Sequence, residues 1–431
     1  MILLLNKKHT QPDIATNTDL KAFRLSVISM FFLSAVSQAQ DVLADLPTLP
    51  MGFTDAPLGF SQAPSGFTQD DSAFAPGPTQ QDFTMNGSVT LAYNSNVRQG
   101  IAGEGNSSSG DLTLSPRVGF NYLRRRDQWQ LGVNAGGSYR FNFDNDDLDG
   151  FNGSIGFFGG YQSTKVVASF STNFSSSSGV NQISGGFLEQ ISYSNSLVAS
   201  YRFSGRTSLM ASWNRSANYT QTSGFDDTSS STFNLSAVWQ ATPLINIGPG
   251  IRYSRREGES GDVTSIGPSL SVNYDLSDRV KLRSSIGANY GELPSGEDTE
   301  FVNWSLSMNY RPPSALWNLN LSMIQDYQST FVEGGGFDEV TSYQLGWGRK
   351  IRRANVGLSL AYRVTDPQET PLSVDNGRDS DFFSINATLG MRVFRDEVTF
   401  NTGISWQDQS ASNQNYSYDG FQYRASLTWQ F

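Results

Sequence analysis

Apolar and polar residues alternate along most of the chain, and the pattern is clearest at its end, in residues 420–431. One parity of this stretch carries the apolar set Phe421, Tyr423, Ala425, Leu427, Trp429 and Phe431. The other parity carries Gln422, Arg424, Ser426, Thr428 and Gln430. Because successive side chains of a β-strand point to opposite faces, the alternation predicts a strand with one apolar and one polar face.

The same alternation recurs from about Thr84 to the end of the chain, interrupted by connections of two kinds. Short turns are expected near 124–127, 162–165, 204–207, 240–243, 275–279, 311–315, 349–353 and 394–397. Longer polar stretches lie near 94–110, 144–150, 175–188, 220–231, 254–262, 291–300, 328–338, 365–381 and 407–418. These connections predict an all-β, transmembrane, antiparallel up-and-down β-barrel over residues 84–431, with about 18 strands (roughly 16–20).

Aromatic residues on the apolar parity gather beside both kinds of connection, with mostly Leu, Ile, Val and Ala between them. Beside the short turns lie Tyr122, Trp129, Tyr161, Tyr201, Trp239, Tyr274, Tyr310, Trp317 and Trp347. Beside the longer stretches lie Tyr93, Phe143, Phe151, Phe174, Tyr193, Tyr219, Tyr253, Tyr290, Tyr327, Tyr343 and Tyr362. Two aromatic rings around an aliphatic band are what the two interfaces of a membrane select, whereas a soluble barrel has no reason to sort aromatic residues by depth.

Composition and charge agree with strands as the elements that cross the membrane. The chain is 37% hydrophobic, its mean hydropathy is -0.37, and it lacks an apolar run of the ~18 residues that a spanning helix needs. The short turns are mainly basic and the longer loops mainly acidic. This polarity favours an orientation with short turns and both termini in the periplasm and longer loops outside.

The first 39 residues are typical of a signal peptide. Lys21 and Arg24 precede the apolar run 25–33, and the small residues Ser37 and Ala39 occupy the positions that a signal peptidase selects. We therefore expect cleavage after Ala39 and export of the remaining chain.

Residues 40–83 are rich in Pro, Gly and Phe and contain a repeat. The tetrapeptides Pro50-Met-Gly-Phe53, Pro57-Leu-Gly-Phe60 and Pro64-Ser-Gly-Phe67 recur at a constant spacing. Proline and glycine in each repeat exclude a coiled coil. Two interpretations stay open: a disordered periplasmic linker, or a tether whose phenylalanines contact a periplasmic partner or enter the barrel mouth.

Over residues 84–431 the chain resembles the porin-type β-barrels of the Gram-negative outer membrane. Its last strand resembles the sorting signal that the barrel-assembly machinery reads, and the matching residues are Tyr423, Leu427, Trp429 and Phe431. The opening strand, which ends Tyr93-Asn-Ser-Asn-Val97, is similar to that of β-barrel proteins from exopolysaccharide gene clusters. The first resemblance implies location in the cell outer membrane, in contact with lipid and lipopolysaccharide. The second implies a role in polysaccharide export.

The residues needed for common catalytic chemistry are missing from the expected mature chain. The only histidine is His9, in the segment expected to be removed, and the chain has no cysteine. Histidine-based triads, thiol nucleophiles and His or Cys metal sites are therefore excluded. The acidic stretch 144–150 breaks the EF-hand spacing at Leu148, which favours a solvated loop. We expect no enzyme activity, cofactor or metal site, and the net charge of -10 argues against nucleic acid as a partner.

The polar parity of the strands is the surface that we expect to line the barrel. It consists mainly of Ser, Asn, Gly, Thr and Gln, with Asp326 as the clearest acid. Its basic residues are Arg117, Arg140, Arg202, Arg252, Lys281, Arg283, Arg363, Arg392 and Arg424. A barrel of this size is too wide for such side chains to fill, so we expect a water-filled lumen that attracts anions. The alternative is that these arginines pair with loop carboxylates and only stiffen the wall.

These observations lead to two hypotheses about function. The first is an outer-membrane pore for passive diffusion of hydrophilic, anionic solutes, or for export of an extended polysaccharide. The alternative is a non-conducting accessory barrel of a surface-polysaccharide or secretion system, in which residues 40–83 contact a periplasmic partner.

Overall fold

The computed structural model describes residues 80–95, 110–180, 187–221, 227–258, 261–292, 298–312, 316–329, 337–368, 379–394, 397–411 and 417–430. The predicted signal peptide (residues 1–39), nearly all of the segment 40–83, and Phe431 lie outside these residues. The first strand begins at Gln80, four residues before the predicted start of the barrel.

Eighteen strands make up nearly all of the described chain. They are β1 (Gln80–Asn94), β2 (Asp111–Arg126), β3 (Trp129–Asn142), β4 (Gly150–Gln162), β5 (Val166–Val180), β6 (Phe187–Arg202), β7 (Thr207–Thr220), β8 (Thr228–Thr242), β9 (Ile245–Gly258), β10 (Gly261–Ser277), β11 (Val280–Glu292), β12 (Asp298–Tyr310), β13 (Trp317–Ser329), β14 (Phe337–Ile351), β15 (Ala354–Gln368), β16 (Ser380–Phe394), β17 (Val398–Ala411) and β18 (Tyr418–Gln430). The predicted number of strands is confirmed within the part of the chain that the structure describes.

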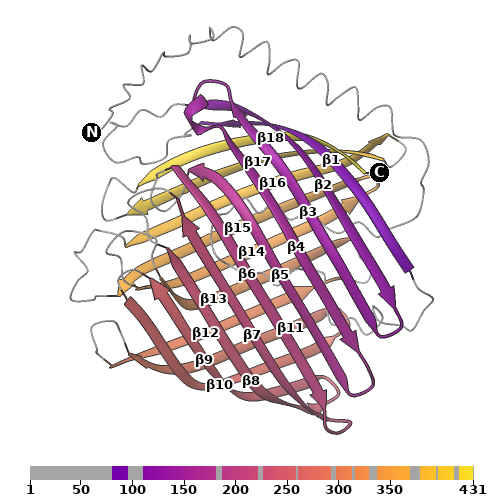
Figure 1. Cartoon of the computed structure of the whole chain (residues 1–431), viewed down its shortest axis with the longest axis vertical. Coiled ribbons are helices and arrows are strands. Elements are labelled where there is room, and N and C mark those ends of the chain that lie inside the picture. The colour runs from indigo at the N-terminus through magenta and orange to yellow at the C-terminus, as the bar shows by residue number, and fades with distance from the viewer. Residues whose placement is uncertain are drawn as a thin grey trace, which may run out of the picture. The chain divides into compact units, whose positions relative to one another are not determined.

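The strands form one closed antiparallel sheet. Each strand pairs with its neighbours in sequence, and β1 pairs with both β2 and β18, which closes the sheet on itself (Figure 1). The closing register runs from Asn86↔Gln430 to Asn94↔Gln422. The predicted up-and-down barrel is therefore confirmed.

The strands are longer than the sequence pattern indicated. They contain 13 to 17 residues, whereas about 9–11 tilted residues cross a hydrocarbon core. The eight short turns lie where they were predicted, but strands extend into several of the predicted long loops. In proportion to its length, the predicted loop 254–262 is the most in error, because β9 continues to Gly258 and β10 begins at Gly261.

The described connections contain little regular structure. They include one 3₁₀ turn, Asp146–Leu148. In these residues no helix is long and apolar enough to cross a membrane. Asp127 and Arg352 adopt φ values of 49° and 53° in two-residue hairpin turns, where the twist of the flanking strands favours positive φ.

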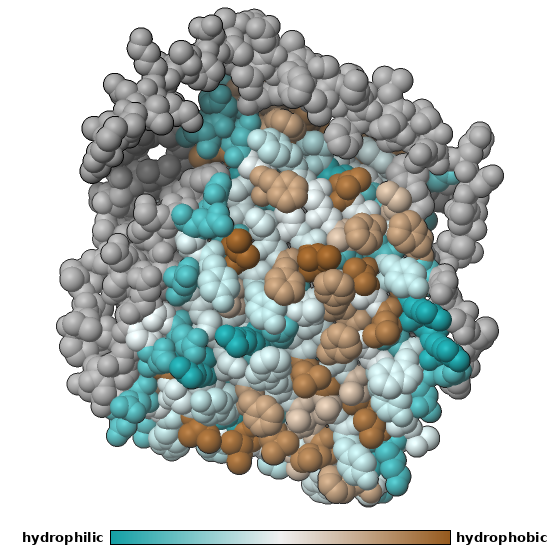
Figure 2. Space-filling view, in the orientation of Figure 1, coloured by the Kyte–Doolittle hydropathy of each residue, from teal (hydrophilic) through white to brown (hydrophobic). Residues whose placement is uncertain are grey.

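The two parities of the strands form the two surfaces of the barrel. On the polar parity, Arg252 of β9 forms an ion pair with Asp326 of β13, and these strands are not neighbours in the sheet. Their side chains therefore meet across the interior, which places the apolar parity outside. The outer surface is extensively apolar (Figure 2), with Trp129 59% exposed and Ile251 54% exposed.

The closing pair of strands contains a close approach between Gly87 of β1 and Trp429 of β18. These residues lie opposite each other on the outer surface, and the indole ring occupies the space that a Cβ atom at position 87 would need. Trp429 therefore covers the strand pair that closes the barrel, and only glycine at position 87 leaves room for it.

We expect Gly87→Val to displace the indole ring of Trp429 and to destabilise the barrel by about 1–3 kcal/mol, the usual cost of overpacking. Thermal denaturation followed by circular dichroism would measure the loss. Gly205→Val is the matched control, because nothing lies within 4 Å of a Cβ atom at that position. Equal melting temperatures for the two variants would contradict the role assigned to this contact.

Candidate channel lumen

Basic side chains outnumber acidic ones on the inward face of the described strands. Strand register places these basic residues inward: Arg117, Arg125, Arg140, Arg202, Arg252, Arg256, Lys281, Arg283, Lys350, Arg363, Arg392 and Arg424. The inward acidic residues of the same strands are Asp82, Asp111, Asp275, Asp326 and Asp338. The nine basic residues predicted to line the lumen all belong to this inward set. The structure does not bring them together into a single site.

Four of the predicted basic residues lie exposed on the inward face: Arg117 of β2, Arg202 of β6, and Lys281 and Arg283 of β11. Lys281 lies opposite Asp275 in the register of β11 with β10, so that part of its charge is balanced. Arg117 has Ser88 and Ser138 as its register partners and is surrounded by small polar residues. Its guanidinium therefore faces the interior without an acidic register partner.

Arg140 has a structural role at the end of the barrel that carries the longer loops. Its guanidinium donates to the carbonyl oxygens of Leu148 (3.1 Å) and Ser178 (2.9 Å). These contacts join β3 to the loop after it and to the end of β5. The guanidinium thus stabilises the rim of the barrel.

Arg363 and Arg424 also contact the wall. Arg363 is buried, and its guanidinium lies 5.3 Å from the ring centre of the inward residue Phe382, which makes a cation–π contact. Arg424 donates from Nε and Nη2 to Oε1 of Gln422 on the same strand (3.1 and 2.7 Å). Arg392 is half-buried on β16. The guanidinium groups of Arg363 and Arg424 are thus held against the sheet by an aromatic ring and an amide oxygen.

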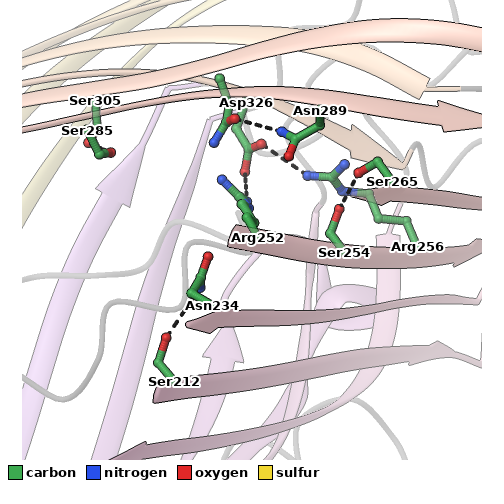
Figure 3. Close-up of polar contacts among 11 residues, drawn as sticks. Ser212, Asn234, Arg252, Ser254, Arg256, Ser265, Ser285, Asn289, Ser305 and Asp326 are labelled. Carbon is green, nitrogen blue, oxygen red and sulfur yellow. Dashed lines mark hydrogen bonds and ion pairs between the residues drawn. The ribbon is translucent and has the colours of Figure 1, made fainter. Parts of the chain in front are cut away.

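An electrostatic cluster in the interior connects β9 with β13 (Figure 3). The carboxylate of Asp326 accepts from Nη2 of Arg256 at 3.1 Å and lies 3.4 Å from Nη2 of Arg252. The side chain of Arg256 is 8% exposed. A charge buried to this degree needs a hydrogen-bonded partner of opposite sign, and Asp326 supplies it.

Polar side chains surround this cluster. Ser254 of β9 and Ser265 of β10 share a 2.8 Å hydrogen bond and are both buried. Asn289 of β11 donates from Nδ2 to Oδ1 of Asn303 of β12 at 2.7 Å. The inward sides of β9 to β13 are thus joined through polar contacts.

Sequence patterns missed Arg256 and the structural importance of Asp111. Arg256 falls in a stretch that was interpreted as a loop, although it continues the inward parity of Arg252. Asp111 is 1% exposed, and its carboxylate accepts from the backbone N–H groups of Phe143, Asp144 and Asn145 and from the side-chain amide of Asn145. An acidic residue directly after a longer loop was the available sign of such a role.

The residues of the predicted assembly signal lie on the outer face of β18. Tyr423, Leu427 and Trp429 share the outward parity, and Val89 and Gly87 of β1 lie opposite the last two of them. Phe431 lies outside the described residues. Recognition of these residues by an assembly machinery stays a prediction.

No protein-family model matches the chain, and no curated protein matches it. Among solved structures it is similar to OpdL from Pseudomonas aeruginosa (TM-score 0.43, 10% identity, covering 82% of this chain and 99% of that one). It is also similar to OprD from Pseudomonas aeruginosa (TM-score 0.41, 12% identity, covering 81% and 95%). A third is the FrpB iron transporter from Neisseria meningitidis (TM-score 0.45, 9% identity, covering 81% and 81%).

We expect Asp111→Ala to loosen the loop 143–149, because the substitution leaves buried N–H donors without an acceptor. Each such donor costs about 1–3 kcal/mol. Limited proteolysis of the detergent-solubilised protein should show faster cleavage in this loop. Asp144→Ala removes an exposed carboxylate from the same loop and should leave the cleavage rate unchanged. If both variants are as resistant as the parent protein, Asp111 does not hold the loop.

Proposed function

We propose that the barrel is an outer-membrane channel for passive diffusion of small hydrophilic solutes, with a weak preference for anions. The observation that carries the proposal is the combination of an apolar outer face with an inward face on which basic side chains outnumber acidic ones. The outer face supports a location in the membrane, and the inward face supports the preference for anions.

The outer face supports a membrane location. Large apolar side chains are exposed on it along nearly every strand, and a protein in water rarely exposes so much apolar surface. Aromatic contacts between neighbouring strands, such as Trp129 with Tyr161 (ring centres 4.6 Å apart) and Tyr310 with Trp317 (5.1 Å), lie beside the short turns. Similar contacts, such as Phe174 with Tyr193 (4.7 Å), lie toward the other end of the strands. Bilayer interfaces select such belts.

The number of strands supports a conducting lumen. Barrel diameter grows with strand number, and barrels of about 16–18 strands leave an aqueous channel. The inward face of this barrel consists largely of small polar residues, which do not fill such a space.

The charge of the inward face supports anion preference. Arg256 and Arg252 are balanced in part by Asp326, whereas Arg117, Arg202 and Arg283 are exposed. Basic side chains on a low-dielectric wall raise the local concentration of anions.

The inward aromatic residues favour small solutes over a polymer that is recognised by stacking. Within the described side chains of the strands, the inward rings are Phe158, Phe301 and Phe382, on β4, β12 and β16. Phe158 lies over Gly132, and Phe301 packs against Tyr327. These rings lie on separate parts of the wall and form no continuous track for sugar rings.

The preference for anions predicts the effect of charge reversal at Arg117. Two unit charges 10 Å apart interact by about 0.4 kcal/mol in water. Arg117→Glu changes the charge by two, so after screening in 0.1 M salt we expect the anion-to-cation permeability ratio to fall roughly twofold. The reversal potential of single channels in planar bilayers under a salt gradient measures this ratio.

Arg124→Glu is the matched control for this experiment. Arg124 lies on β2 near the short turn, on the outward parity, and the substitution changes the net charge of the protein equally. An equal shift in both variants would mean that Arg117 does not act through the lumen. Absence of channels in the parent protein would overturn the proposed function.

The Pro-Gly-Phe repeat supports a second proposal, an accessory role in surface-polysaccharide assembly or secretion through a periplasmic partner. Deletion of residues 40–79 leaves β1 intact. If the repeat binds a partner, the deletion should abolish that role while single-channel conductance stays unchanged. Export of surface polysaccharide by the producing cells and conductance of the purified barrel measure the two effects. Unchanged export and unchanged conductance would reduce the segment to a linker.

A further inference from the structure

The barrel wall contains a partial gap between β12 and β13. These strands share seven register pairs, from Tyr310↔Leu319 to Trp304↔Gln325, whereas every other pair of neighbours shares nine or more. Both strands continue beyond the last pair: β12 extends to Asp298 and β13 to Ser329. The outer part of each strand thus lacks its neighbour on one side.

Each unpaired end remains part of the sheet on its other side. Asp298 of β12 pairs with Glu292 of β11, and Ser329 of β13 pairs with Phe337 of β14. The gap is therefore a separation of two well-formed strands and is not a frayed end.

The outer part of β13 is drawn toward the interior. β13 approaches β9, which is four strands away in the sheet, and Asp326 bonds with Arg252 and Arg256 there. Tyr327, the next residue, was expected in the outer aromatic belt but is only 8% exposed. Its ring centre lies 4.5 Å from that of Phe301, and the two residues form a buried apolar cluster with Val263.

Polar contacts close the outer side of the gap. Tyr327 donates from its hydroxyl to Glu339 of β14 at 2.8 Å, and Gln325 donates to the same carboxylate at 2.6 Å. Trp304 of β12 donates from its indole N–H to Gln325 at 2.5 Å. Side chains thus replace the backbone ladder where the two strands separate.

The existing register defines a second position for this part of β13. If the ladder continued, Asn303 would pair with Asp326, Val302 with Tyr327, Phe301 with Gln328 and Glu300 with Ser329. In that position Asp326 would leave Arg252 and Arg256, and Tyr327 would turn to the outer surface, where its parity places it. A change from the inward to the paired position would break the ion pairs of Asp326 and the apolar contacts of Tyr327. It would form additional backbone hydrogen bonds between β12 and β13.

We propose that the outer part of β13, residues 326–329, is a gate of the channel with an inward position and a paired position. The inward position, held by Asp326, narrows the lumen between β9 and β13. The paired position returns the strand to the wall and widens the lumen. The proposal rests on the channel function above.

Disulfide trapping tests the movement directly, because the chain has no cysteine of its own. Glu300→Cys with Ser329→Cys should join only in the paired position. Leu306→Cys with Met323→Cys is the control pair, since these residues are already register partners on the same face. Register pairs of antiparallel strands alternate between hydrogen-bonded and non-hydrogen-bonded geometry. The two cysteine pairs lie an even number of residues apart along each strand, so both would have the same geometry.

The rate of oxidation is compared with and without Asp326→Asn. We expect this substitution to speed disulfide formation in the Glu300/Ser329 pair roughly tenfold, which corresponds to about 1.4 kcal/mol, and to leave the control pair unchanged. Asp262→Asn is the matched charge control: it breaks an exposed ion pair with Arg255 (2.7 Å) near the same rim but on the outer face. It should affect neither pair.

A second variant shows whether an effect of Asp326→Asn comes from misfolding or from movement of the strand. Asp326→Asn leaves Arg256 buried without its counter-charge, which destabilises a protein strongly. The double variant Asp326→Asn with Arg256→Gln removes both charges and should speed oxidation in the same way. Equal oxidation rates in all backgrounds would overturn the proposed movement.

Single-channel conductance separates the gate from the channel itself. Asp326→Asn should raise the conductance, and Asp262→Asn should not. Faster oxidation with unchanged conductance would overturn the gate while leaving the channel in place. A parent protein that oxidises as expected but never conducts would overturn the channel function instead.

Discussion

The structure depends on one constraint: the backbone of every strand must find a partner on both sides. In a membrane, water is not available to satisfy an unpaired edge, so the sheet has to close. The pairing of β1 with β18 meets this need, and the indole of Trp429 covers Gly87 at that point. The partial gap between β12 and β13 departs from the same rule, and there side chains supply the missing contacts.

Closure also determines what the two faces of the wall can do. With every strand alternating between the outer and inner surfaces, each second residue faces the interior, and most of these residues are polar. The interior is therefore organised by polar contacts, and the apolar core is small: Val263, Phe301 and Tyr327 lie together beside the Asp326 cluster. The order of the interior comes mainly from paired charges and hydrogen bonds.

Much of this architecture could be predicted from the sequence, because alternation is a local property. The parity of Trp429, Leu427 and Arg424 was correct, and so were the positions of the short turns. The positions of several individual side chains depend on contacts between residues far apart in the sequence and could not be predicted. Arg256 was assigned to a loop because charged and polar residues surround it, although its parity continues that of Arg252. Tyr327 was assigned to the outer belt because its burial depends on Phe301 of β12 and Val263 of β10, which lie far from it in the sequence. Arg140 carries no local sign that loop carbonyls bind it.

The register of the closing strands has a consequence for how the molecule is made. Asn86 and Gln430 are partners although nearly the whole barrel lies between them in the chain. Such non-local contacts are slow to form, because a long loop must be closed before they give any stability. The open sheet therefore keeps two free edges until its last strand arrives, and free edges promote aggregation. A cell producing this protein must protect those edges until the barrel closes.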